Sequence, residues 1–246
     1  MPRKAATASV ADEDAAIGGV AAVDRALSLL AAFSAAQSAL SLAELAQAAR
    51  LYKSTVLRLL ASLLHAGLVL QRVDGRYALG PQIARLSSVY ARSFSLGDAV
   101  LPALQQLVDE TGESAAFHIR QGDARLCLYR VDSPRPVRDH IRAGDLLPLD
   151  RGAGARVLDA WASPSARLSG ARNARLARDV RRLGYFAGIG DREKDIAGIS
   201  APVFNADGSL AGALTLTTPS HRYQAAHVES VLRAAASLST ALGHAG

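Results

Sequence analysis

The chain has 246 residues, a formal net charge of +6 and a single cysteine, Cys127. Half of the residues are hydrophobic and a fifth are charged, which favours a folded globular protein and excludes wholesale disorder. One cysteine excludes a disulfide framework and a cysteine-rich zinc site, and the apolar runs are too short to cross a bilayer. No signal peptide is recognisable, so we expect a cytoplasmic protein without a membrane partner.

The first part of the chain predicts a tail, a helix and a second, capped helix. Residues 1–19 are rich in Ala, Asp and Gly and show no apolar period, which predicts a flexible tail. A helix begins at Val20, because apolar residues then recur at helical spacing. Ser41 and Glu44 have the spacing of a capping box and predict a short helix that ends near Arg50.

A third helix is predicted over residues 53–65, followed by a hairpin. Val56, Leu59, Leu60 and Leu63 form one buried stripe, and Gly67 ends the helix. Residues 68–73 and 76–79 read as two strands, joined by the Asp74-Gly75 turn. The order helix, helix, turn, helix, hairpin is that of a winged helix-turn-helix, here over residues 20–81.

The exposed face of the third helix and the hairpin are the predicted DNA interface. Small polar residues let a helix lie deep in the major groove, where Arg58 can reach a guanine edge or a phosphate. The segment from Ser41 to Arg85 has six basic and two acidic residues, and its net charge of +4 suits binding to phosphate groups. An ordinary surface helix could show the same exposed residues. The predicted DNA contacts are Ser41, Lys53, Ser54, Thr55, Arg58, Arg72 and Arg76.

The second half predicts a linker helix over residues 82–96 and a mixed α/β domain over residues 97–246. Helical spacing and strand-rich runs alternate with Gly- and Pro-containing turns. The expected helices cover residues 98–111, 153–162, 171–183 and about 224–242. The expected strands cover residues 114–120, 125–131, 196–204 and 210–218, with a further strand near 137–142.

An ordered series of short motifs resembles the IclR family of bacterial transcriptional regulators. It comprises Val23-Asp24-Arg25-Ala26-Leu27, Leu40-Ser41-Leu42-Ala43-Glu44-Leu45-Ala46, Lys53-Ser54-Thr55-Val56-Leu57-Arg58-Leu59-Leu60, Arg76-Tyr77-Ala78-Leu79-Gly80, Thr111-Gly112-Glu113, Pro148-Leu149, Gly184-Tyr185 and Ala201-Pro202-Val203-Phe204. The resemblance covers nearly all of the chain after residue 20. It implies a winged helix-turn-helix, a linker helix and a GAF-like effector-binding domain. It also implies homodimers, often paired into tetramers, on palindromic or repeated operators.

The resemblance further implies that the C-terminal domain binds a small organic acid. The family's effector loop matches residues 150–156, where the backbone N–H groups of Gly152 and Ala153 would face a carboxylate. Arg156 stands where the family usually has Lys, and Asp150 stands where it usually has His. The other implied effector contacts are Asp191, Ala201, Thr215 and Thr217, although threonine is also a common strand residue.

The sequence therefore predicts an effector-responsive, operator-binding regulator that needs no cofactor and no metal. No nucleophile elbow, phosphate-binding loop or paired catalytic carboxylate is present, so we expect no enzyme. The alternative is a small-molecule sensor or enzyme whose winged helix serves protein contacts only. We expect Cys127 in the core. His118 and His140 lie on predicted strands and could line the pocket, but packing or surface roles are favoured for both.

Overall fold

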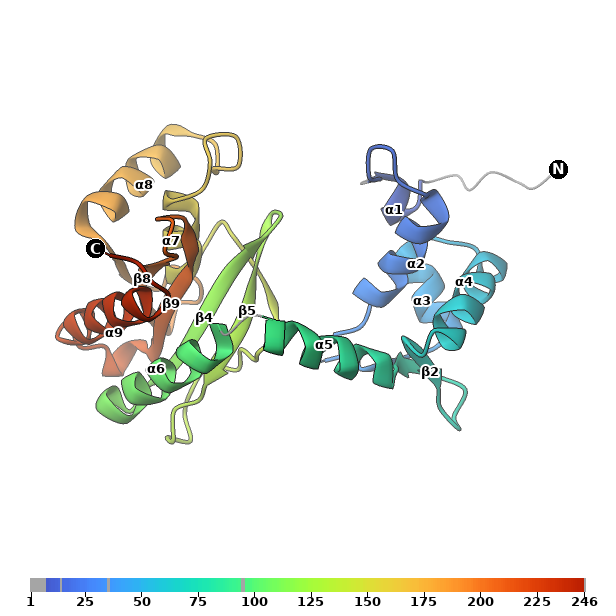
Figure 1. The fold of residues 1–246 in the computed structure, drawn as a ribbon, viewed down its shortest axis with the longest axis horizontal. Coiled ribbons are helices and arrows are strands. Elements are labelled where there is room, and N and C mark those ends of the chain that lie inside the picture. The colour runs from blue at the N-terminus through green and yellow to red at the C-terminus, as the bar shows by residue number, and fades with distance from the viewer. Residues whose placement is uncertain (1–7, 14, 35, 94–95, 246) are drawn as a thin grey trace. The chain divides into compact units, whose positions relative to one another are not determined.

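The structure is a computed structural model that describes residues 8–13, 15–34, 36–93 and 96–245 (Figure 1). The chain divides into two compact units, Met1–Ser93 and Phe94–Gly246. Within the described residues, no helix is both long and apolar enough to cross a membrane.

The N-terminal unit combines helices with a small antiparallel sheet, and it confirms the winged helix-turn-helix. Its strands lie in the order β1-β3-β2, and β1 was not expected from the sequence. The tail predicted over residues 1–19 lies outside the described residues up to residue 7, while Val10–Glu13 form a short helix. The elements are α1 (Val10–Glu13), α2 (Ala21–Ala31), β1 (Ala39–Leu40), α3 (Leu42–Ala49), α4 (Lys53–His65), β2 (Val69–Gln71), β3 (Tyr77–Leu79) and α5 (Pro81–Ser93).

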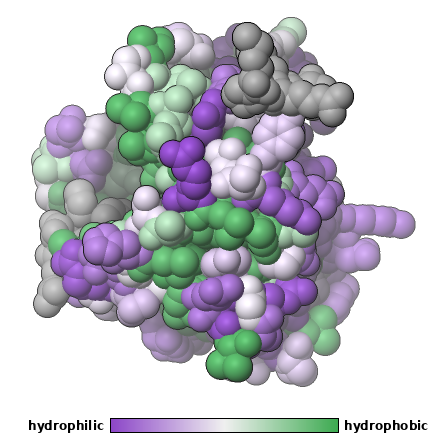
Figure 2. All heavy atoms as spheres, turned by 90° about the vertical axis from the view of Figure 1, so that its right-hand side faces the viewer, coloured by the Kyte–Doolittle hydropathy of each residue, from purple (hydrophilic) through white to green (hydrophobic). Residues whose placement is uncertain are grey.

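The core of this unit is made by one face each of α2, α3 and α4. Leu29, Leu45 and Leu60 are almost completely buried within it. Val23 and Leu27, which share a helical face in the sequence, are instead more than half exposed. Figure 2 shows apolar surface between hydrophilic side chains on the side of the molecule turned to the viewer.

The capping box forms as predicted and also holds the hairpin. The Ser41 N–H donates to Glu44 Oε2 (2.7 Å), and the Glu44 N–H donates to Ser41 Oγ (3.3 Å). From the hairpin, Arg76 Nη1 donates to the Ala39 carbonyl and to Glu44 Oε2, both at 3.1 Å. Arg76 therefore links the hairpin to β1 and to the first turn of α3.

The C-terminal unit is built on a six-stranded antiparallel sheet in the order β6-β5-β4-β9-β8-β7. The observed bounds of α8, β8 and β9 lie within one residue of those expected from the sequence. The elements are α6 (Leu96–Thr111), β4 (Ser114–Gln121), β5 (Ala124–Val131), β6 (Leu146–Pro148), α7 (Ala153–Ala160), α8 (Ala171–Leu183), β7 (Phe186–Ile189), β8 (Ile196–Phe204), β9 (Leu210–Pro219), a 3₁₀ turn (Ser220–Arg222) and α9 (His227–Ala241).

The strand expected near residues 137–142 is not formed, and that prediction is wrong. This segment is an irregular loop, and the edge strand β6 follows it at 146–148. Asp139 is buried in the loop, where it accepts hydrogen bonds from Arg130 and Arg192. Side-chain ion pairs hold this segment in place of a backbone ladder.

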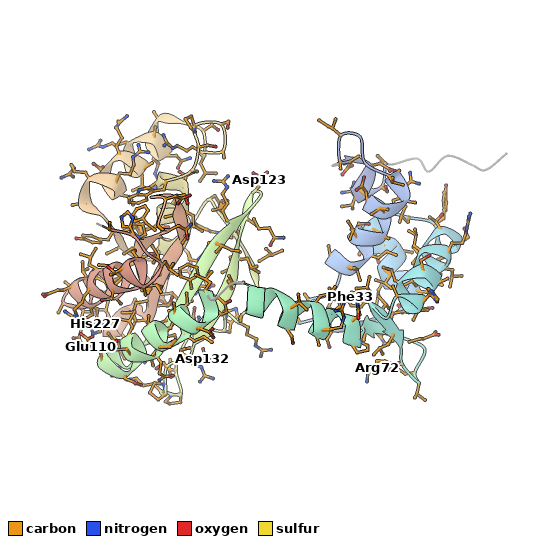
Figure 3. The ribbon with its side chains drawn as sticks, viewed as in Figure 1. Phe33, Arg72, Glu110, Asp123, Asp132 and His227 are labelled. Atoms are coloured by element: carbon orange, nitrogen blue, oxygen red, sulfur yellow. The ribbon has the colours of Figure 1, made fainter. Side chains whose placement is uncertain are left out.

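The sheet separates two layers of helices. On one face, α6 and α9 pack on Leu214, Leu216 and other apolar side chains of the central strands. These two helices are also joined where Ser230 Oγ donates to Glu110 Oε1 (2.7 Å), in the region labelled Glu110 and His227 in Figure 3. On the other face, α7 and α8 form a second apolar cluster that includes Ala213 of β9. The side chains between α7 and the strands are thereby enclosed.

Replacement of Ser41 by Ala tests whether this residue acts as a helix cap. The change removes the acceptor for the Glu44 N–H, and we expect the free energy of unfolding to fall by about 1 kcal/mol in urea denaturation. Ser62→Ala, on the exposed face of α4, is the matched control and should change stability by less than about 0.5 kcal/mol. Equal effects of the two variants would contradict the capping role.

Candidate functional site

Helix α4 presents an exposed face of small residues and two free cations. Val56 and Leu60 anchor the opposite face in the core. Lys53, Ser54 and Arg58 are exposed, and Thr55 is half-buried. Within the described residues, Lys53 and Arg58 form no ion pair and no side-chain hydrogen bond. The face predicted to enter the major groove is therefore unobstructed within this unit.

Three further residues were predicted to contact DNA: one side chain has only a weak ion pair, and two are engaged within this unit. Arg72 lies on the hairpin, labelled in Figure 3, and its half-exposed side chain has only the distant Asp74 carboxylate beside it, at 3.9 Å. Ser41 and Arg76 are both engaged with Glu44. Both side chains are therefore engaged within this unit, and a direct contact with DNA stays a prediction for each.

A cation next to this face was not singled out from the sequence. Arg50 ends α3 with a left-handed backbone (φ 52°), at the turn that leads into α4. Its Nη1 lies 2.7 Å from Glu13 Oε1, and Arg25 forms a similar pair with Asp12. The carboxylates of α1 thus neutralise two arginines of the DNA-binding unit.

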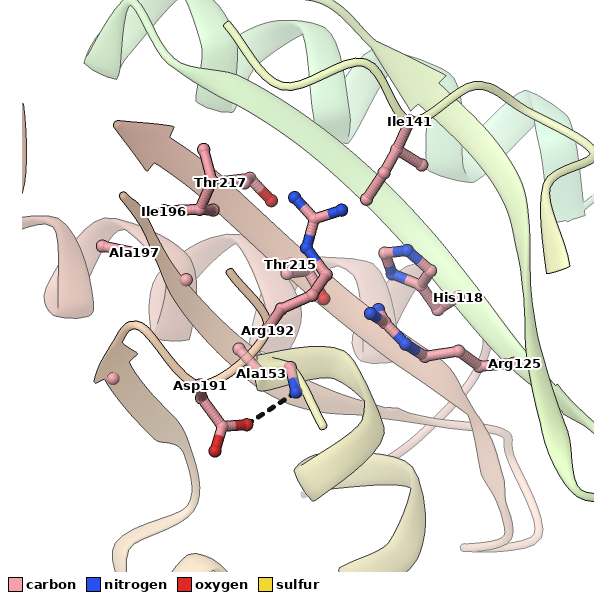
Figure 4. Close-up of a pocket in the computed structure, with 13 residues that line it drawn as sticks. His118, Arg125, Ile141, Ala153, Asp191, Arg192, Ile196, Ala197, Thr215 and Thr217 are labelled. Atoms are coloured by element: carbon pink, nitrogen blue, oxygen red, sulfur yellow. Dashed lines mark hydrogen bonds between the residues drawn. The ribbon is translucent and has the colours of Figure 1, made fainter. Parts of the chain in front are cut away.

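In the C-terminal unit, a small enclosed pocket lies between the sheet and the start of α7 (Figure 4). Its free volume is about 20 Å³, which is room for about one water molecule. Residues from β4, β5, β8, β9, the start of α7 and the turn after β7 line it: His118, Arg125, Ile141, Gly152, Ala153, Gly188, Asp191, Arg192, Ile196, Ala197, Gly198, Thr215 and Thr217.

Two arginines, Arg125 and Arg192, line the pocket. Arg125 is only 2 % exposed, and its Nε donates to the Pro148 carbonyl at 3.3 Å. Burial, together with the nearby charge of Arg192, lowers the pKa of Arg125 to about 10. Arg192 is paired with Asp139 at 3.1 Å. Within the described residues, Arg125 has no carboxylate partner.

His118 lies beside these arginines, and its imidazole forms no hydrogen bond within the described residues. It is 1 % exposed, and neither ring nitrogen has a hydrogen-bond partner within the described residues. Burial lowers its pKa well below the usual value, and the charges of Arg125, Arg130 and Arg192 lower it further. The imidazole is therefore neutral at physiological pH, and it can both donate and accept a hydrogen bond. The sequence left a place in the pocket open for His118 but favoured a packing or surface role.

Gly154 of α7 allows these polar groups to converge. A Cβ atom at this position would lie 3.0 Å from Thr215 Oγ1, 3.1 Å from Arg125 Nη1 and 3.2 Å from His118 Nδ1. Each of these distances is shorter than an ordinary van der Waals contact. The lack of a side chain at Gly154 therefore leaves the space in which a hydroxyl, an imidazole and a guanidinium meet.

Asp191 uses the N–H group that was expected to face a ligand. The Gly152 N–H donates to Asp191 Oδ2 (2.6 Å), drawn as the dashed line in Figure 4, and Arg156 donates to both carboxylate oxygens at 3.0 and 2.8 Å. Burial raises the pKa of Asp191, but the hydrogen bonds from Arg156 and Gly152 outweigh it and leave the pKa lowered. Asp150 is exposed and lies outside the pocket lining, beside Arg151.

Ala201, which was predicted as an effector contact, does not line this pocket. Successive side chains of a strand point to opposite faces of the sheet. Ser200 pairs with Thr215 across the strands, while Ala201 pairs with Leu214 and is buried in the core on the other face. The pocket-side neighbour is Ser200, whose hydroxyl lies 2.9 Å from Thr215 Oγ1. Thr215 and Thr217 do line the pocket.

The sequence carried a signal for Arg125 that was not used. Arg125 and Cys127 share one face of β5, and the thiol is buried, with its pKa raised by burial to about 11. A charged side chain on the buried face of an apolar strand lowers stability unless an opposite charge or a hydrogen bond compensates it. Within the described residues, no group of three or more His, Cys, Asp or Glu side chains could hold a metal ion.

Comparison with known proteins gives the family. The IclR helix-turn-helix domain matches residues 22–72, and the C-terminal domain of bacterial IclR transcriptional regulators matches residues 89–178, together more than half of the chain. The HTH-type transcriptional regulator BhcR of Paracoccus denitrificans is 29% identical over 208 residues, which cover 76% of this chain and 75% of the relative. These relatives are regulators of transcription and not enzymes.

Solved structures agree. An IclR-family transcriptional regulator from Rhodococcus is 30% identical, with a TM-score of 0.54 over 93% of this chain and 94% of that one. An IclR regulator from Silicibacter is 26% identical, with a TM-score of 0.80 over 91% and 97%. An IclR homologue from Microbacterium hydrocarbonoxydans, in complex with 4-hydroxybenzoate, shares the fold at 22% identity and a TM-score of 0.80 over 90% and 98%. The chain therefore belongs to the IclR family of bacterial transcriptional regulators.

Proposed function

We propose that this regulator binds operator DNA through α4 and the hairpin, and that a small carboxylic acid in the pocket of the C-terminal domain modulates the binding. The observation that carries the effector half is the buried guanidinium of Arg125, which has no carboxylate partner within the described residues. A buried charge without a partner is costly, and an anionic ligand would supply the missing charge.

The other groups in the pocket suit an acid that also carries a hydroxyl group. A carboxylate would take charge-assisted hydrogen bonds from Arg125. His118 and the Thr215 hydroxyl could then bind a neutral oxygen. The related Microbacterium regulator holds 4-hydroxybenzoate, which combines these two functions on a ring. Because the free space is about 20 Å³, such a ligand requires the pocket to open.

Asp191 is proposed to respond to the ligand indirectly. Its carboxylate already occupies the N-terminus of α7 through Gly152 and Arg156. A helix N-terminus favours an anion, so an incoming carboxylate near Ala153 would compete with Asp191 for the same partial positive charge. Release of Asp191 would free Arg156 and shift the turn after β7.

On the DNA side, we propose that two copies of the chain act together. Val20, Val23 and Leu27 line one edge of α2 and are between 53% and 63% exposed, which is unusual for large apolar side chains at regular helical spacing. A self-complementary contact would cover them and would bring two α4 helices to successive half-sites of an operator. The effector would change their spacing.

Arg58→Ala tests base reading by α4. If Arg58 contacts a base edge, specific operator binding should weaken by about 1–3 kcal/mol, while binding to random DNA changes little. Gel-shift titrations with the DNA upstream of the chain's own gene would measure both affinities. Arg178→Ala, an exposed arginine of α8, is the matched control and should leave both unchanged. Equal losses on operator and random DNA would make Arg58 a phosphate contact instead.

Arg125→Met tests the effector site, because methionine keeps most of the volume and removes the charge. A small acid that raises the melting temperature of the unaltered protein, with 4-hydroxybenzoate as the first probe, should bind the variant about ten- to a hundredfold more weakly. Arg142→Met changes a nearby exposed arginine and should keep the full response. A stabilising acid that acts equally on both variants would rule out Arg125 as the anion partner.

His118 should make the protein sensitive to acid. Its folded-state pKa lies below the usual 6.5, so below that value the unfolded chain binds a proton that the folded chain does not. The free energy of unfolding therefore falls as the pH drops through 6.5. In His118→Gln this part of the fall should be missing in urea melts between about pH 8 and about pH 5. His140→Gln, an exposed histidine, should keep the full fall.

A further inference from the structure

A second hollow of the C-terminal unit lies where the ends of α7 and α8 meet α9 and the far end of β8. Its volume is about 310 Å³, which is within the range of small-molecule pockets and is far larger than the space beside Arg125. It shares no lining residue with the pocket of Figure 4. Of the residues that were predicted to contact the effector, only Ala201 lines this hollow.

Small residues create this space. Gly184 follows α8, Ala201 lies on β8, and Ala235 and Ala236 lie on α9. A larger side chain at any of these positions would reach into the hollow. Because three elements each contribute a residue with little or no side chain, the hollow is a consequence of the sequence at several separate points.

Aromatic rings form the rim. The Trp161 and Phe204 rings are arranged edge to face, with centroids 5.8 Å apart and planes at 68°. The His244 ring lies against Phe204, with centroids 5.2 Å apart. Edge-to-face pairs are a favourable arrangement that an additional ring can extend. Trp161 is also the only tryptophan of the chain.

The lining offers no charge and few free polar groups. Within the described residues, no Asp, Glu, Lys or Arg lines the hollow. The Ser239 hydroxyl donates to the Ala235 carbonyl and accepts from the Phe204 N–H, and the Thr240 hydroxyl donates to the Ala236 carbonyl. Among the lining side chains that the structure describes, the imidazole of His244 and the indole N–H of Trp161 form no hydrogen bond.

We propose that this hollow is a second ligand site, which takes an uncharged molecule with a single aromatic ring, packed against the Trp161–Phe204 pair, with a hydroxyl group directed to His244. Apolar cavities of about 150 Å³ already accept benzene, so one ring with a small substituent fits the volume. A carboxylate would find no cation here, which separates this ligand class from the acid proposed for the first pocket.

The end of β8 argues against an added protein strand as the occupant. An extended peptide joins a sheet through backbone donors and acceptors. Pro202 has no N–H group, and the N–H of Phe204 is already used by Ser239. The strand end that borders the hollow therefore lacks these two donors, whereas a small apolar ligand needs none.

Trp161 emission in the full-length protein tests the proposal, with toluene, phenol and benzoate as probes. Toluene and phenol should change the emission saturably. Ala236→Leu fills the hollow from an exposed helix position and should weaken both by at least tenfold, while Ala241→Leu, an equal change outside the lining of the same helix, should leave them unchanged. Benzoate should not bind in the hollow, so any change of emission that it causes should be the same in Ala236→Leu as in the unaltered protein.

Two further variants make the outcome decisive. His244→Phe keeps a ring against Phe204 and removes the hydrogen-bonding nitrogens, so it should weaken phenol and leave toluene unaffected. Arg125→Met should leave the phenol response intact, so failure of the acid site and failure of this site are distinguishable. The proposal is overturned if toluene and phenol give no saturable change, or if Ala236→Leu and Ala241→Leu bind them equally. Equal loss of phenol and toluene in His244→Phe would overturn the role of the hydroxyl.

Discussion

The two-residue period of the central strands determines what the C-terminal unit can do. Along β9, Leu214 and Leu216 point to the layer of α6 and α9, while Thr215 and Thr217 point to the layer of α7. One face of the same strand therefore builds a dry core and the other builds a polar chamber. A slip of register by one residue would exchange these roles and bury the hydroxyls in the core. The ladder between β8 and β9, which pairs Ser200 with Thr215, keeps that register over eight residue pairs, from Ile196 to Val203.

Not all of the charged side chains around the pocket are paired with an opposite charge. Asp139 is buried with Arg130 and Arg192, and Asp191 is held by Arg156 and by the start of α7. Arg125 is left out of these pairs. A buried guanidinium without a carboxylate partner costs stability. On the proposed function, an anionic ligand would recover part of that cost, so ligand binding and the stability of this unit are expected to be linked.

The sequence predicted the parts of the fold that local patterns determine. The stripe of Val56, Leu60 and Leu63 predicted α4, and the Ser41–Glu44 spacing predicted the cap. The prediction failed for residues 137–142, where the buried ion pairs of Asp139 decide the path. Ala201 lies on the other face of the sheet from the pocket, because the face on which a strand residue lies depends on the register with its neighbours. Arg125 was missed, and a packing or surface role was preferred for His118, because their significance depends on partners that are far away in the sequence. Of the effector contacts that the resemblance implied, Gly152, Ala153, Asp191, Thr215 and Thr217 line the pocket.

The short helix α1 changes how the charge of the DNA-binding unit should be counted. Glu13 already neutralises Arg50, and Glu44 neutralises Arg76. A cation that is paired within the protein releases fewer counterions when it meets a phosphate than a free one does. If DNA binds as proposed, the salt dependence of binding should reflect Lys53, Arg58 and Arg72 more than the full complement of basic residues. Removal of the residues up to Glu13 should then free Arg50 and steepen that dependence without any change in α4.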